Sequence, residues 1–201
     1  MKKLNRFIRY TLLLYGLIVL VYFTFARPAL INWGAKKEEI KMQLPGADLI
    51  SDNRIVSTRA INIKAPPEKI WPWISQTGQN RGGFNSYYWL ENIFGATMEN
   101  ASTIHPEWQD PLVGDTVYYG KNEGYALVSL VDKNRYYSLG GWTFFLQPIN
   151  VGNTRLIVRY PSMEVRQSTF MKIYYYGLFE ALHFIMESGM MMGIRQKAER
   201  L

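Results

Sequence analysis

The feature that most limits what this chain can fold into is an uncharged apolar run near its N-terminus. Between Arg9 and Arg27 the sequence reads YTLLLYGLIVLVYFTFA, so residues 10–26 carry no charged side chain. A helix rises about 1.5 Å per residue, and about 17 residues is the lower limit for crossing the ~30 Å hydrocarbon core of a bilayer. The two flanking arginines can extend their charged heads to the interfaces. The run therefore predicts a transmembrane helix.

A cleaved signal peptide is the competing interpretation, because Thr24 and Ala26 are small enough to precede a cleavage site. However, Arg27-Pro28 follows at once and is a poor context for cleavage. The apolar run is also long for a signal-peptide core. We therefore favour an uncleaved anchor over residues 10–26.

The basic residues of the chain indicate how that anchor is oriented. The net charge is +7, and four basic residues precede the span, whereas those after it are interleaved with acids, as in KKEEIK at 36–41. An excess of Lys and Arg marks the cytoplasmic side of a span. Residues 1–9 are therefore expected in the cytoplasm, and the globular part outside it, at the cell membrane. The sequence contains no basic helix or aromatic RNA-binding signature, so no nucleic-acid partner is expected.

Several kinds of chemistry are excluded or unsupported by the sequence. The 201 residues include no cysteine, which excludes disulfides, thiol nucleophiles and thiolate metal sites. The loop GQNRGG at 78–83 has the wrong glycine spacing for a P-loop, and no GxGxxG or GxSxG occurs. A lone histidine beside two carboxylates is thin support for metal. We therefore expect no metal and no cofactor, and no self-sufficient catalytic set within residues 78–95.

The elements after the anchor follow a clear order. Residues 27–53 are expected to form a juxtamembrane stalk with a short amphipathic helix in 32–44, either solvated or lying on the membrane. A strand is predicted at 54–64, a short or kinked helix from Pro66-Pro67, and a second short helix at 84–94. Turn residues then separate short strands, and the chain ends in a long helix. These later elements are expected at 116–119, 125–131, 135–139, 142–147, 154–160 and 169–200.

Short loops between consecutive strands favour an antiparallel meander. A curved sheet wrapped around the long C-terminal helix is the economical arrangement, because each element needs the other to bury its apolar face. The fold class predicted is therefore α+β, with one globular domain at 54–201 and an N-terminal transmembrane helix.

Three stretches carry a resemblance to a known superfamily: TRAINIKAPPEKIWPWISQTGQNRGGFNSYYWLENIFG at 58–95, VGD at 113–115 and HFIMESGMMMGIRQKAE at 183–199. Together with the element order, they resemble the SRPBCC superfamily, the START and polyketide-cyclase-like helix-grip proteins. The RGGF stretch and HFIME resemble a narrower bacterial subgroup, often membrane-anchored and without an assigned activity. The resemblance implies a hydrophobic ligand cavity between sheet and helix. It implies no single chemistry, because members differ widely in function.

The loop and helix at 78–95 offer the first candidate site residues. For Arg81 the favoured interpretation is a tight glycine turn, with its guanidinium solvated or paired with an acid; anion binding is the alternative. The aromatic residues that follow suit either core packing or the wall of a cavity. On the sheet, alternation puts Trp142 and Phe144 on one face.

The C-terminal helix offers the second set of candidates. At 100° per residue, Glu180, His183 and Glu187 share one face, and a broad apolar stripe forms another. The stripe is expected to face the sheet. The polar cluster is then a solvated outer face, a site for ligand or acid–base chemistry, or a surface that meets the stalk, a partner or the membrane. The stripe comprises Leu178, Leu182, Ile185, Met186, Gly189 and Met192.

The function expected from these features is binding of a hydrophobic small molecule or lipid close to the membrane. The rivals are a cyclase- or hydrolase-like enzyme using the helix cluster, and a protein-interaction module whose cavity is vestigial. The candidate ligand-binding residues are Arg81, Phe84, Tyr87, Tyr88, Trp89, Trp142, Phe144, Glu180, His183, Met186 and Glu187.

Overall fold

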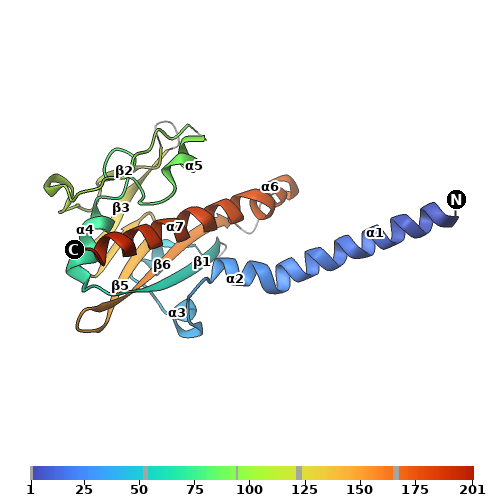
Figure 1. The fold of residues 1–201 in the computed structure, drawn as a ribbon, viewed down its shortest axis with the longest axis horizontal. Helices are drawn as coiled ribbons and strands as arrows, with labels where there is room; N and C mark the ends of the chain where they lie inside the picture. Colours follow the sequence, from blue (N-terminus) through green and yellow to red (C-terminus); the bar gives the residue numbers. More distant parts are fainter. Residues whose placement is uncertain (1, 52–53, 94, 121–123, 165–167) are drawn as a thin grey trace.

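The chain folds into a single antiparallel sheet, a long C-terminal helix laid across it, and an N-terminal helix that projects away from both (Figure 1). This architecture comes from a computed structural model. It describes residues 2–51, 54–93, 95–120, 124–164 and 168–201.

The sheet has six strands in the order β1-β6-β5-β4-β3-β2, and every neighbouring pair is antiparallel. Strands β2 to β6 follow one another as the predicted meander, and β1 joins the sheet by pairing with β6. The predicted strands are therefore confirmed, with bounds that differ by a few residues. The strands are β1 Arg54–Ile63, β2 Thr116–Tyr118, β3 Tyr125–Asp132, β4 Tyr136–Leu139, β5 Trp142–Asn150 and β6 Asn153–Glu164.

The C-terminal helix is continuous from Thr169 to Ala198 but changes geometry along its length. It begins as α6 (Thr169–Tyr174), passes through a π-helical turn at Tyr175–Phe179, and continues as α7 (Glu180–Ala198). The sheet curves around this helix, which confirms the predicted α+β helix-grip fold. Two shorter helices and a 3₁₀ turn connect β1 to the meander: α4 Pro67–Ser75, α5 Tyr88–Ile93 and Pro106–Trp108.

Helix α5 begins four residues later than the sequence indicates. Asn85 has a positive φ of 57°, and its side-chain amide donates to the backbone oxygen of Trp73 at 3.2 Å. The backbone of Asn85 also lies so close to Gly193 of α7 that a Cβ there would overlap its carbonyl oxygen. These contacts fix the chain at 84–87 in a non-helical form and seat Phe84 in the core.

Inward-facing side chains of the sheet form the main core with α4 and α7. Every second residue of each strand points toward the helix, because successive side chains of a strand lie on opposite faces of the sheet. Trp142, Phe144 and Leu146 of β5 are all buried on this face, as predicted. Met190, Met191 and Ile194 supply the contribution of α7.

Residues 27–51 pack on the domain instead of standing free as a stalk: 27–31 contact α7 and β1, and 35–44 pack on the opposite face of the sheet. Only Lys37–Lys41 of the expected amphipathic segment is helical (α3), and 27–31 forms α2 (Arg27–Ile31). Glu39 of α3 is buried and accepts two hydrogen bonds from Arg155 at 2.8 Å each. The Arg159 guanidinium donates to three backbone oxygens of the same segment, at 2.6–3.0 Å. The segment is therefore part of the domain's structure.

The N-terminal helix confirms one part of the membrane prediction. Helix α1 (Lys2–Val21) continues through a π-helical turn at Tyr22–Ala26 into α2, without a break. Over Asn5–Ile31 it is long and apolar enough to cross a bilayer, and its most apolar window is not buried against the rest of the chain. Figure 1 shows it extending away from the domain. Its orientation across a membrane stays a prediction.

Candidate ligand-binding cavity

A cavity of about 460 Å³ lies between the inward face of the sheet and the C-terminal helix. Its volume is in the range of sites that hold small organic ligands. Aliphatic and aromatic side chains make up most of its wall, and a few polar side chains interrupt it. The lining residues are Phe84, Ser86, Leu90, Glu91, Ala96, Tyr119, Trp142, Tyr160, Tyr174, Leu178, Phe179, Leu182, His183, Met186, Glu187 and Met190.

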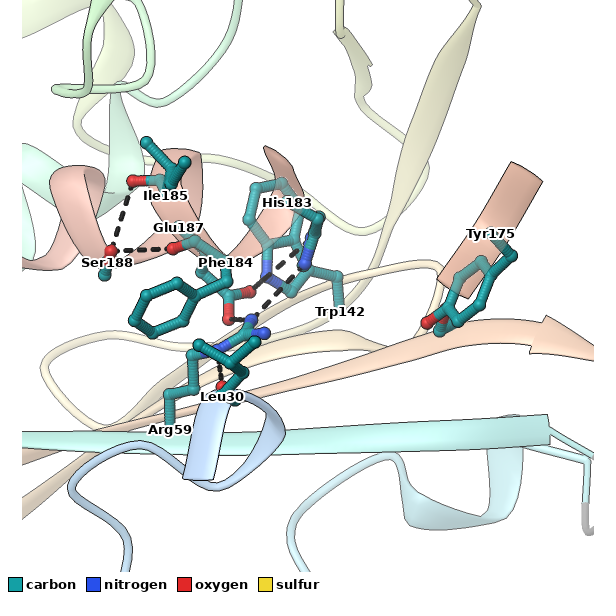
Figure 2. A network of polar contacts seen from close by, with 10 residues as sticks. Leu30, Arg59, Trp142, Tyr175, His183, Phe184, Ile185, Glu187 and Ser188 are labelled. Atoms are coloured by element: carbon teal, nitrogen blue, oxygen red, sulfur yellow. Dashed lines mark hydrogen bonds and ion pairs between the residues drawn. The ribbon is translucent and has the colours of Figure 1, made fainter. Parts of the chain in front are cut away.

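Glu187 is the centre of the polar groups in this wall. Its carboxylate forms an ion pair with Arg59 of β1 and accepts a hydrogen bond from the Trp142 indole Nε1 at 2.9 Å (Figure 2). Both side chains of the ion pair are only 1% exposed. The Arg59 guanidinium also donates through Nε to the Leu30 backbone oxygen at 3.0 Å. The buried carboxylate therefore has both a cation and an indole N–H as partners, which offsets the cost of its burial.

His183 stands one helical turn before Glu187 and contacts the same arginine. Its Nδ1 lies 3.3 Å from Arg59 Nη1. Arginine is only a donor, so Nδ1 accepts and the ring proton sits on Nε2. Burial lowers the pKa of His183 to about 4, and the Arg59 charge adds to the lowering while Glu187 opposes it. The imidazole is therefore neutral at pH 7, and its protonated Nε2, in the cavity wall, lies 3.9 Å from Glu187 Oε1, too far for a hydrogen bond.

Two tyrosines place their rings and hydroxyls in the same part of the cavity. The Tyr160 ring stacks on the His183 ring, with centroids 4.1 Å apart. Burial raises the pKa of Tyr160 to about 12 and also raises the pKa of Tyr119. Within the described residues, neither hydroxyl has a hydrogen-bond partner. Both phenols therefore remain protonated and present O–H groups toward the cavity.

The predicted orientation of the C-terminal helix is wrong. The polar cluster faces the sheet: Glu180 and Glu187 are each 2% exposed. Of the apolar stripe expected there, Leu178, Ile185 and Met192 are 42–49% exposed. Only three of its members (Leu178, Leu182 and Met186) line the cavity. Hydrophobicity alone assigns the wrong face because the two glutamates are compensated by arginines from distant segments.

Glu180 lies outside the cavity, near the point where the N-terminal helix meets the domain. Its carboxylate accepts from Arg27 Nε at 2.9 Å and from the Tyr22 hydroxyl at 3.3 Å. The Arg27 guanidinium also lies over the Tyr176 ring, 5.1 Å from its centroid. Glu180, a predicted ligand-binding residue, instead links α7 to the N-terminal helix through these bonds.

Other candidates from the sequence also lie away from the cavity. Arg81 pairs with Asp115 at 3.5 Å, beside a turn in which Gly78 and Gly83 have positive φ, which agrees with the favoured interpretation of that loop. Tyr87 packs against Gly189, and Tyr88 and Trp89 are more than half exposed. Phe144 is fully buried beneath Trp142, with ring centroids 5.0 Å apart. The candidates that line the cavity are Phe84, Trp142, His183, Met186 and Glu187.

Sequence reasoning missed Arg59, Tyr119 and Tyr160. A signal for Arg59 does exist: it has the same strand parity as Ile61 and Ile63, which point into the core. A cation on the apolar face of a strand requires a buried carboxylate partner. Glu187, bordered by apolar helix residues, is the natural counterpart.

Comparison with known proteins gives fold-level likenesses only. No protein-family model and no curated protein sequence matches the chain. Among solved structures, CalC, a self-sacrificing resistance protein from Micromonospora echinospora, is 12% identical, with a TM-score of 0.45 over 74% of this chain and 97% of its own. MLL2253 from Mesorhizobium loti is 18% identical, with a TM-score of 0.36 over 71% and 97%. Aha1 from Colwellia psychrerythraea is 15% identical, with a TM-score of 0.34 over 67% and 98%. Likenesses this weak carry no argument about ligand or activity.

Proposed function

We propose that this chain is a single-pass membrane protein whose domain binds an apolar small molecule or lipid in the cavity between sheet and helix. In this proposal the N-terminus is cytoplasmic and the domain lies outside the cytoplasm, because residues 1–9 carry four basic and no acidic residues, whereas the charges just after the span are mixed. The observation that carries the proposal is the cavity itself. It is large enough for a ligand, and its wall is mostly apolar.

The polar groups in the wall support a more specific ligand class. The Nε2–H of His183 and the hydroxyls of Tyr119 and Tyr160 are donors, and all three belong to neutral side chains at pH 7. Neutral donors in an apolar pocket suit a ligand with an uncharged oxygen acceptor, such as a carbonyl or ether. A ligand carboxylate would lie near the Glu187 carboxylate in the same wall, which disfavours it.

The two rival functions receive less support. A general acid or base at neutral pH needs a pKa near 7, whereas burial holds the pKa of His183 at about 4. The Glu187 carboxylate is already occupied by Arg59 and Trp142. A vestigial cavity would be filled by side chains, and about 460 Å³ argues against that.

Native mass spectrometry of the full chain, released from detergent after purification from membranes, tests the proposal. We expect a bound apolar species whose occupancy falls in Met186→Trp, because the larger indole would take up space in the cavity that the ligand needs. Met192→Trp is the matched control, since that methionine is exposed on the same helix and does not line the cavity. A bare protein mass for the unmodified chain, or an equal adduct in both variants, would contradict ligand binding in this cavity.

A further inference from the structure

Helix α6 carries large apolar side chains that nothing else in the described part of the chain covers. Phe170 is 76% exposed and Ile173 67% exposed, and Met171 and Tyr174 are also exposed. Lys172 is the one charged residue of this helix, and it is partly buried. A cluster of this kind on a short helix end marks a contact with another apolar surface.

The contacts of the neighbouring π-helical turns show which surface is close by. Tyr22 donates from its hydroxyl to the Tyr176 backbone oxygen at 3.2 Å, and the Phe23 and Tyr176 rings lie 5.3 Å apart. Five residues further toward the domain, Arg27 pairs with Glu180. The N-terminal helix and the start of the C-terminal helix therefore run parallel to each other here, both toward the domain.

This pairing fixes the direction in which α6 projects. Moving from Arg27 toward the N-terminus leads into the predicted membrane span. Moving from Glu180 back toward Phe170 leads the same way, over ten residues, or about 15 Å at the rise of a helix. Figure 1 shows α6 and the N-terminal helix projecting on the same side of the domain. With Arg27 at the membrane surface, α6 therefore lies on the bilayer side of that surface.

We propose that α6 is a second membrane-contacting element, whose apolar side chains enter the bilayer leaflet on the domain's side. Lys172 can extend its ammonium to the headgroups, as lysine does near membrane surfaces. This occupant is favoured over a protein partner because the turn that follows α6 packs against the proposed span, which a bilayer would surround. The inference rests on the membrane anchoring proposed above.

The position of α6 also defines how a ligand reaches the cavity. Tyr174, exposed at the end of α6, lines the cavity together with Leu178 and Phe179 of the π-helical turn. The apolar surface of α6 is thus continuous with the cavity wall. With α6 in the leaflet, the cavity opens at the membrane surface, so the ligand class is a membrane-dissolved lipid rather than a water-borne metabolite.

Single nitroxide labels test the insertion of α6 directly. The chain has no cysteine, so Phe170→Cys and Ile173→Cys each provide one labelling site without further changes. Val151→Cys is the matched control, because Val151 is 100% exposed in the β5–β6 hairpin, remote from the N-terminal helix in Figure 1. The full chain is reconstituted in phosphatidylcholine–phosphatidylglycerol vesicles. Relaxation of each label is measured with dissolved oxygen, which concentrates in lipid, and with a water-soluble nickel chelate.

We expect the labels at 170 and 173 to collide more with oxygen than with nickel, and the label at 151 to show the reverse. Nickel accessibility at 170 and 173 equal to that at 151 would overturn the proposal. Spin–spin broadening between labels at 173 would overturn it in favour of a second copy as the occupant. This measurement needs no ligand. Labels that enter the bilayer in a chain with no co-purifying species would refute only the proposed ligand binding. A co-purifying species in a chain whose labels stay in water would refute only the insertion of α6.

Discussion

The buried ion pair between Arg59 and Glu187 ties the edge strand β1 to the C-terminal helix across the interior of the domain. The same guanidinium reaches His183 at 3.3 Å and the Leu30 backbone oxygen at 3.0 Å. One side chain thus joins the N-terminal segment, the sheet and the helix, and holds the histidine in the tautomer that presents Nε2–H to the cavity.

Removing only one charge of this pair should lower the free energy of unfolding substantially. Arg59→Met leaves Glu187 buried without its cation, which typically destabilises by about 3–5 kcal/mol. Pairing Arg59→Met with Glu187→Met should recover much of that loss, because no uncompensated charge remains. Denaturant unfolding of the detergent-solubilised chain measures both. Arg135→Met is the control, since that arginine pairs with Asp132 at the surface and should cost little. A single variant no less stable than this control would contradict the buried-pair assignment.

The stability contributed by His183 should depend on pH in a defined direction. Its pKa is about 4 when folded and 6.5 ordinarily, so the unfolded chain binds the proton first. The contribution is therefore complete above pH 6.5 and is lost as pH falls from 6.5 toward 4. Between pH 7.5 and 4.5 the parent should lose about 2–3 kcal/mol more than His183→Gln. Parallel curves for the two proteins would mean that the imidazole is not buried in its neutral form.

The two glycines of α7 should respond very differently to alanine. A Cβ at Gly193 would overlap the backbone oxygen of Asn85, whereas one at Gly189 would meet only the ring of the half-exposed Tyr87, at 2.6 Å. Backbone cannot swing aside as a surface ring can. Gly193→Ala should therefore lower the unfolding free energy by about 1–3 kcal/mol, and Gly189→Ala by much less. Equal effects in thermal unfolding would show that the loop at Asn85 does not pack against the helix.

The cavity hydroxyls should contribute to ligand retention without being needed for folding. Tyr160→Phe removes one donor but keeps the ring that stacks on His183. The loss of one neutral hydrogen bond, about 0.5–1.5 kcal/mol, corresponds to a roughly 2- to 12-fold weaker complex. The fraction of chain that keeps the co-purified species in native mass spectra measures this. Tyr118→Phe, on the exposed side of β2, is the control and should retain the parent fraction.

Local patterns predict the strands well, because turn residues and alternation depend on near neighbours in the sequence. They do not predict the inward face of α7. Glu180 and Glu187 are buried because Arg27 and Arg59, more than a hundred residues earlier, neutralise them. The start of α5 is missed for the same kind of reason, since Asn85 is fixed by contacts with Trp73 and α7. Ion pairs and contacts between distant segments therefore determine which side chains face the interior. The periodicity of a single helix carries no information about them.

The chain contains only two histidines, which makes the central claim directly measurable. Selective ¹⁵N-histidine labelling gives spectra of two imidazoles, and His105→Gln assigns them. At pH 7, His183 should be neutral, with its proton on Nε2. That resonance should shift between the chain as purified from membranes and the chain stripped of apolar molecules on a hydrophobic resin. A charged ring, a proton on Nδ1, or an Nε2 resonance indifferent to stripping would contradict a ligand bound through His183 in this cavity.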